Sequence, residues 1–227
     1  MKLNRLALFG LDLLFPPRCM FCGEIIAPGT KICQECAKNI VPSGTVHCIQ
    51  IPVKKKEISC AFLYSYEGRV RDSIIQYKFH GQKQYAGFYA QELAKQVKNI
   101  FPGTEFDFVT SVPLSDERKK ERGYNQSELI AKPIAEALHL PYLVCLQKIK
   151  ANGVQHLMNR EQRANNVRGA YSLSGESVKE KKILLIDDIV TTGATLAECA
   201  SVLFECGAED VSCAAIARVA PEEVEKS

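Results

Sequence analysis

Residues 183–195, ILLIDDIVTTGAT, decide the fold of this 227-residue chain. Four consecutive apolar residues lead into Asp187 and Asp188, and a turn rich in hydroxyl groups follows, with Gly193 near its centre. An apolar run without alternation is typical of a parallel strand that is buried on both faces. The stretch therefore predicts a buried strand, a short turn, and a helix that begins near Ala194.

The turn between Thr191 and Thr195 has the composition of an anion site. Backbone N–H groups at the start of a helix favour an anion, and the threonine hydroxyl groups of Thr191, Thr192 and Thr195 add further donors. Gly193 allows the backbone to close on a phosphate. We therefore expect this turn to bind a phosphate group.

The adjacent aspartates indicate a second kind of contact at the same place. Ligands bind open parallel sheets at the carboxyl ends of the strands, where Asp187 and Asp188 are expected. Carboxylates accept hydrogen bonds from a vicinal diol, so the whole stretch suits a ribose 5-phosphate. The alternative is a capped helix after a buried strand, with both aspartates exposed at a sheet edge. Neither a Walker-type phosphate loop nor the glycine pattern of dinucleotide-binding folds is present.

The chain from residue 61 onward alternates between strand-like and helix-like segments. Strands are expected at 60–66, 106–113, 181–186 and 211–217, and helices at 84–100, after Asn125, and from 194 to about Gly207. Pro133 is expected to kink or trim the helix after Asn125. This alternation predicts an α/β fold with a parallel sheet flanked by helices.

The first 60 residues differ in composition and contain two C-x2-C pairs that are ten residues apart. Two such pairs complete a tetrahedral thiolate shell, for which structural Zn²⁺ is the natural occupant. Two redox-active pairs and an iron–sulfur cluster are the alternatives. We therefore predict a zinc-binding module at 1–60 and a second domain at 61–227. The predicted ligands are Cys19, Cys22, Cys33 and Cys36.

Charge and hydropathy restrict the location and the type of partner. The formal net charge is +3, but residues 118–168 alone carry 10 basic and 4 acidic side chains. Such focused charge favours a local anion site over a surface that coats a polyanion.

At the N-terminus, Asp12 interrupts the apolar run, so residues 1–19 are expected to form a short docking helix and not a signal peptide. No apolar run approaches the roughly 18 residues of a membrane span. We expect a cytoplasmic protein, with peripheral attachment at the inner face of the membrane as an option.

These segments resemble a known family. Four apolar residues, two acids and a Thr-Thr-Gly-x-Thr turn resemble the phosphoribosyl pyrophosphate (PRPP) loop of type I phosphoribosyltransferases. Nearly the whole chain resembles the ComF family, in which a four-cysteine finger precedes such a domain and which is linked to DNA uptake in natural transformation. The matching segments are CMFCG, CQEC, YKFHGQ (77–82), SVPLSDERKKERGYNQS (111–127), QHLMNREQRANNVRGAY (155–171) and the PRPP-like loop.

The resemblance implies a type I phosphoribosyltransferase-like sheet and a set of residue roles. Asp187 and Asp188 would be the catalytic carboxylates, and Mg²⁺ would accompany PRPP. The loop 111–115 would face the diphosphate beside a run of cations, although a solvated charged loop is the alternative. Lys78 would be a further anion contact or an ordinary surface lysine. Residues 152–168 would form a mobile flap. The PRPP-binding set is then Thr191, Thr192, Gly193, Ala194, Thr195, Lys78, Pro113, Leu114, Arg118 and Arg122.

Two functions follow from this resemblance and from the pocket chemistry. In the first, a PRPP-binding protein assists the import of single-stranded DNA into the cytosol, beside a helicase-like ATPase of the competence machinery. In the second, an active transferase moves ribose 5-phosphate from PRPP to a nitrogenous base or amine. A DNA-binding zinc protein is a weaker third, because the finger lacks an evident recognition helix and the run 54–56 is a thin phosphate patch.

Overall fold

A five-stranded sheet forms the centre of the computed structural model, which describes residues 15–51, 56–149 and 169–220. From β2 to β3 the neighbouring strands are parallel, and β1 pairs with β2 in antiparallel orientation at one edge. The predicted parallel sheet is confirmed, and the antiparallel edge strand is an addition to it. The strand order is β1 (Val46–Ile51), β2 (Lys56–Ser65), β7 (Asp210–Arg218), β6 (Lys182–Val190) and β3 (Phe108–Ser111).

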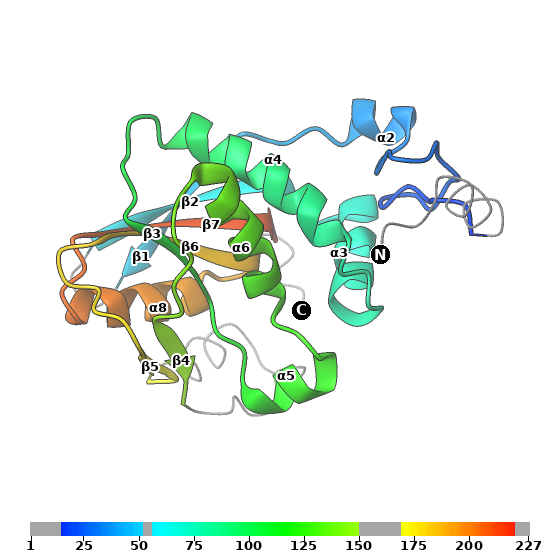
Figure 1. The fold of residues 1–227 in the computed structure, drawn as a ribbon. Coiled ribbons are helices and arrows are strands. Elements are labelled where there is room, and N and C mark those ends of the chain that lie inside the picture. Colours follow the sequence, from blue (N-terminus) through cyan, green and yellow to red (C-terminus); the bar gives the residue numbers. More distant parts are fainter. Residues whose placement is uncertain (1–14, 52–55, 150–168, 221–227) are drawn as a thin grey trace.

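Helices cover both faces of this sheet. Figure 1 shows α4 and α6 on one face and α8 on the other. A separate two-stranded antiparallel sheet of β4 and β5 packs beside α8. The helices are α2 (Gln34–Asn39), α3 (Gly68–Phe79), α4 (Tyr85–Ile100), α5 (Asp116–Arg122), α6 (Gln126–Leu138) and α8 (Ala194–Glu205), and the strands of the small sheet are β4 (Leu146–Lys148) and β5 (Tyr171–Leu173).

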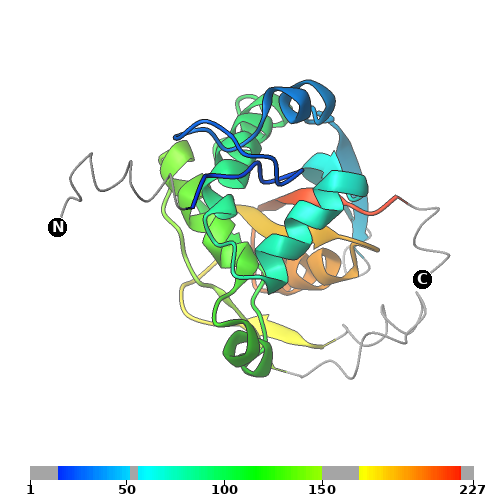
Figure 2. The same ribbon diagram turned by 90° about the vertical axis from the view of Figure 1, so that its right-hand side faces the viewer.

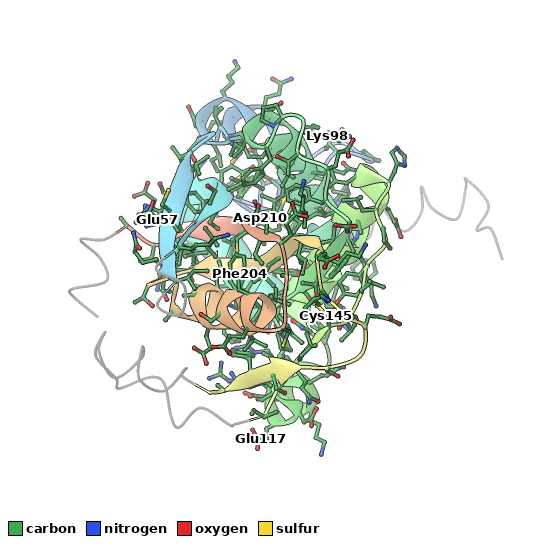
Figure 3. The ribbon with its side chains drawn as sticks, turned by 90° about the vertical axis from the view of Figure 1, so that its left-hand side faces the viewer. Glu57, Lys98, Glu117, Cys145, Phe204 and Asp210 are labelled. Atoms are coloured by element: carbon green, nitrogen blue, oxygen red, sulfur yellow. The ribbon has the colours of Figure 1, made fainter. Side chains whose placement is uncertain are left out.

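Two apolar cores lie on opposite faces of the sheet. One joins the cysteine module to α3, α4 and α6, and includes Phe21, Tyr77 and Ile186. The other lies between the sheet and α8, where Phe204 is buried (Figure 3). Strand β6 contributes buried side chains to both cores, which is why its sequence shows no alternation of apolar and polar residues.

The expected helices are confirmed, with one correction. Asn125 caps α6, since its side-chain oxygen accepts a hydrogen bond from the Ser127 N–H at 3.1 Å. Pro133 lies inside α6, which continues to Leu138, so the expected trimming of the helix is wrong. Proline removes one backbone hydrogen bond, but burial of Ile130 and Ile134 on the same helix face offsets that loss.

The predicted boundary at residue 60 falls within β2. Both β1 and β2 belong to the main sheet, although β1 comes from the segment predicted as the zinc module. The division into two domains therefore stays a prediction. The docking helix expected at residues 1–19 falls mostly outside the described residues, and the flap expected at 152–168 falls entirely outside them. Within the described ranges, no helix combines the length and the apolar character that crossing a bilayer demands.

Candidate ligand-binding site and metal centre

The acid pair lies on an interior strand. β6 runs between β7 and β3, and it continues past Ile186 to Val190. Asp187 and Asp188 are therefore the sixth and seventh residues of this strand, and each is only 9% exposed. The alternative of two aspartates exposed at a sheet edge is wrong. Two neighbouring carboxylates at this depth need compensating partners.

Lys78 supplies one of these partners. Its Nζ lies 2.8 Å from Oδ2 of Asp188, and the two side chains are 16% and 12% exposed. Lys78 stands in the last turn of α3, far from Asp188 in the sequence. It is therefore a largely buried, ion-paired lysine and not an ordinary surface lysine. An anion that binds beside Asp188 would lie next to the Lys78 ammonium group.

Asp187 has a different environment. Its Oδ1 accepts hydrogen bonds from the Ser127 hydroxyl group and from the Asp188 N–H, both at 2.9 Å. Burial, and next the negative charge of Asp188, raise the pKa of Asp187 to about 7. The pair can therefore offer one carboxylate held by a cation and one that exchanges a proton near neutrality. Both are suited to the hydroxyl groups of a diol.

Hydrogen bonds at the start of α6 connect this helix to α3 and α5 beside the acid pair. The Tyr77 hydroxyl donates to the Gln126 carbonyl at 2.7 Å, and Gln126 Nε2 donates to the Lys78 carbonyl at 3.3 Å. Arg122 donates to the Gln126 side-chain oxygen at 3.3 Å. Sequence reasoning missed Gln126 and Ser127 as site residues. Both residues follow the helix cap Asn125 directly and lie in segment 111–127, which resembles the ComF family, and this position could have identified them.

The turn after β6 has the predicted form. Gly193 has a φ of 78° and is the N-cap of α8, which begins at Ala194. The positive φ favours glycine, and a Cβ atom at Gly193 would approach the Ile49 side chain to 3.2 Å, so that this side chain would have to shift. The Thr192 hydroxyl accepts from the Ala194 N–H at 3.3 Å. Thr191 is exposed, and Thr195 is half-buried.

The predicted diphosphate loop follows β3. The Val112 N–H donates to the Ile186 carbonyl at 2.9 Å, which ties this loop to the strand that bears the acid pair. Pro113 and Leu114 are half-buried. In α5, Arg118 and Arg122 are half-buried, whereas the two lysines between them are exposed. The alternative of a solvated charged loop therefore holds for those lysines and not for the arginines.

Arg122 packs against an aromatic ring and feels the charge of the acid pair. Its guanidinium carbon lies 4.7 Å from the centre of the Phe79 ring, within the range of a cation–π contact. Burial lowers the pKa of Arg122, and the nearby charge of Asp188 opposes this effect. Three segments that are far apart in the sequence therefore lie together around the acid pair: residues 77–79, 122–127 and 187–188.

The cysteine module has the donor set of a zinc site. The Sγ atoms of the four predicted ligands all lie within 4.8 Å of one another, and those of Cys22 and Cys33 are 3.7 Å apart. Tetrahedral Zn²⁺ with Zn–S bonds of about 2.3 Å places sulfur atoms roughly 3.8 Å apart. Cys33 also caps α2, since its sulfur accepts from the Cys36 N–H. The four thiols therefore fit a structural zinc ion.

A cavity of about 750 Å³ lies between this module and α3, away from the acid pair. Its lining includes Arg18, Asp72, Gln76 and Tyr85. Arg18 also donates to the Gly23 carbonyl at 3.0 Å and so takes part in the fold of the module. Since its lining contains none of the predicted PRPP-binding residues, we do not place the ribose phosphate there.

Comparisons with known proteins agree with both parts of this arrangement. A family model described as a double zinc ribbon domain matches residues 10–60, and a model described as a phosphoribosyl transferase domain matches residues 87–227.

Individual relatives match over most of the chain. The chain is 32% identical over 194 residues to the competence protein ComFC of Streptococcus pneumoniae (strain ATCC BAA-255 / R6), over 84% of this chain and 82% of the relative. It is 27% identical over 201 residues to the DNA utilization protein YhgH of Escherichia coli (strain K12), over 85% and 86% of the two chains. A solved structure described as the allosteric regulatory enzyme of purine biosynthesis aligns at 23% identity and a TM-score of 0.42, over 62% of this chain and 29% of that chain.

Proposed function

The chain belongs to the phosphoribosyltransferase domain family and to its ComFC branch, and we propose that it binds PRPP and acts in DNA uptake during natural transformation. In this role it assists the passage of single-stranded DNA into the cytosol. Its partners are single-stranded DNA and a helicase-like ATPase of the competence machinery. It works in the cytoplasm, at the inner face of the membrane.

The PRPP proposal rests on two different binding features that are close together in the sequence: the acid pair on β6 and the turn that follows this strand. Asp187 and Asp188 lie near the end of the strand, and the Gly193 turn opens α8 a few residues later. The carboxylates accept hydrogen bonds from the ribose hydroxyl groups, and the N–H groups of the turn take the 5-phosphate. The two contacts together select a sugar phosphate over a free diol or a free phosphate.

The diphosphate of PRPP requires positive charge on the other side of the ribose. Arg118 and Arg122 of α5 supply it in our proposal, and Lys78 adds an ammonium group. Pro113 and Leu114 form the turn that faces the diphosphate. Mg²⁺, when bound with PRPP, neutralises further diphosphate charge. Lys78 pairs with Asp188 in the described structure. When the ligand binds, the Lys78 ammonium group must therefore interact with both the Asp188 carboxylate and the diphosphate.

The second candidate is an active transferase that moves ribose 5-phosphate to a nitrogenous base or amine. The buried acid pair favours it, because carboxylates near the ribose stabilise positive charge that develops as the diphosphate leaves. In this case Asp187 and Asp188 are catalytic residues, and the remaining contacts hold the substrate in position.

Titration calorimetry with PRPP and Mg²⁺, followed by a pyrophosphate-release assay, tests both candidates. Saturable Mg²⁺-dependent binding without pyrophosphate release supports a PRPP-binding protein that does not turn PRPP over. Release that depends on an added base or amine supports the transferase. Absence of binding by the folded, zinc-loaded chain would refute the PRPP site itself.

A further inference from the structure

One side chain joins the cysteine module to the helix that carries Lys78. Arg69 lies in the first turn of α3, and its Nη1 donates to Oε1 of Glu35 at 2.9 Å and to Sγ of Cys36 at 3.5 Å. Glu35 and Cys36 are neighbours in α2, and Cys36 is fully buried. A single guanidinium group therefore bridges two segments that lie far apart in the sequence.

A zinc ion with four thiolates carries a net charge of −2, so a charged donor to one sulfur has a clear physical effect. Outer hydrogen bonds orient metal ligands and stabilise their bound form. Backbone donors already serve two sulfurs, because the Cys33 N–H points to Cys19 Sγ and the Cys36 N–H points to Cys33 Sγ, both at 3.4 Å. Arg69 differs from these donors because it brings a positive charge from outside the module.

The same helix serves the proposed ligand site at its other end. Lys78, which pairs with Asp188, is nine residues after Arg69, and this spacing corresponds to about 14 Å along a helix. Figure 2 shows α3 running from the cysteine module toward α5. Buried Val70, Ile74 and Tyr77 hold the helix against the core. A displacement at its first turn is therefore passed along a stiff element.

Packing adds a second connection. Phe21, between the first two cysteines, makes edge-to-face contacts with Tyr64 at 5.9 Å and Phe88 at 6.2 Å. It belongs to the same apolar core as Tyr77 and Ile186, the neighbours in sequence of Lys78 and Asp187. Loss of the metal would thus disturb packing that also supports the ligand-binding residues.

We propose that Arg69 is a positioning residue that fixes the zinc-loaded module to α3, and that zinc and the sugar phosphate thereby strengthen each other's binding. The second half of this inference rests on the ligand site proposed above. Because binding free energies are linked, an effect of zinc on ligand affinity requires an equal effect of the ligand on zinc affinity. Arg69 itself contacts neither the ligand nor the metal.

The test uses the full zinc-loaded chain and measures the rate of zinc transfer to a chromophoric chelator, with and without saturating ribose 5-phosphate. Arg69→Ala should release zinc about tenfold faster than the unmodified chain, the size expected for an outer hydrogen bond. Arg69→Lys, which keeps the charge, should fall between them. Arg71→Ala, which replaces an exposed arginine in the same helix, is the matched control and should leave the rate unchanged.

Ribose 5-phosphate should slow zinc release from the unmodified chain, and its affinity, measured by calorimetry, should fall several-fold in Arg69→Ala. Zinc release from Arg69→Ala at the rate of the Arg71→Ala control would overturn the positioning role. Normal ribose 5-phosphate affinity in Arg69→Ala, despite faster zinc release, would overturn the linkage. If ribose 5-phosphate fails to bind the unmodified chain, the proposed ribose-phosphate contacts at the acid pair and the Gly193 turn are wrong, and so is the linkage, while the zinc-release rates still test the role of Arg69.

Discussion

Lys78 and Asp188 form an ion pair in which Nζ and Oδ2 are 2.8 Å apart, and both side chains are largely buried. The pair joins the last turn of α3 to the strand that bears both acids, and it places a cation on Asp188, whereas Asp187 accepts hydrogen bonds from Ser127 and from the Asp188 N–H. Lys78 is therefore a structural partner of the acid pair as well as a candidate ligand contact.

Removal of this cation should destabilise the fold. Lys78→Met leaves Asp188 unpaired beside Asp187, and we expect a loss of about 2 kcal/mol in the free energy of unfolding, less than for a fully buried pair. Urea denaturation at neutral pH measures it. Lys95→Ala, which removes the exposed partner of Glu92, is the control and should change stability by less than about 0.5 kcal/mol. Equal effects of the two substitutions would contradict a special role for Lys78.

Loss of both negative charges should remove ligand binding without loss of the fold. In Asp187→Asn with Asp188→Asn, we expect ribose 5-phosphate affinity to fall roughly 100-fold or more, because two charge-assisted hydrogen bonds disappear. Calorimetry measures the affinity, and zinc content and circular dichroism report the fold. Asp72→Asn, which replaces an exposed aspartate on α3, is the matched control. Unchanged affinity in the double variant would show that the diol does not bind at the acid pair.

The raised pKa of Asp187 predicts a pH dependence of stability. The folded chain retains this proton up to a pKa of about 7, whereas the unfolded chain releases it near the usual 3.8. Because the folded state binds more protons in that window, its stability falls as pH rises through it and stays lower above. Asp187→Asn, which keeps an oxygen acceptor for Ser127, should therefore gain several degrees in Tm at about pH 8 and little at about pH 4. An equal gain at both pH values would contradict the raised pKa.

Gly193 should not tolerate a side chain. Its φ is 78°, and a Cβ atom there would lie 3.2 Å from the Ile49 side chain. Gly193→Ala should therefore cost about 1–2 kcal/mol of stability and weaken ribose 5-phosphate binding, as thermal denaturation and calorimetry can measure. Gly87→Ala is the matched control, because this helical glycine has open space around it and the substitution should stabilise α4 by up to about 1 kcal/mol. Unchanged ribose 5-phosphate affinity in Gly193→Ala would show that this turn is not part of the binding site.

The cysteine module should depend on its metal. Cys22→Ser removes one of four thiolates, and we expect most of the bound zinc to be lost and the Tm to fall by several degrees, because metal coordination contributes folding energy. Elemental analysis and thermal denaturation measure both. Cys48→Ser, which replaces an exposed cysteine outside the cluster, should retain the metal and the Tm. Full zinc content in Cys22→Ser would refute the four-thiolate site.

The sequence by itself determined the features that depend on local spacing. The apolar run before Asp187 predicted the buried strand, Gly193 predicted the turn before α8, and the paired cysteines predicted the metal cluster. Each pattern is set by neighbours along the chain, through strand burial, backbone conformation or ligand spacing. Pro133 shows the limit of such reasoning, since burial of the flanking residues keeps α6 intact.

Only the tertiary structure decided which distant residues meet. It brought Lys78 and Ser127 to the acid pair, placed β1 in the main sheet, and set Arg69 against Cys36. A lysine or a serine on a helix has no local sequence mark that identifies its partner. That partner is fixed when the helices pack their apolar faces on the sheet, because this packing determines which polar side chains are buried together and must then satisfy one another.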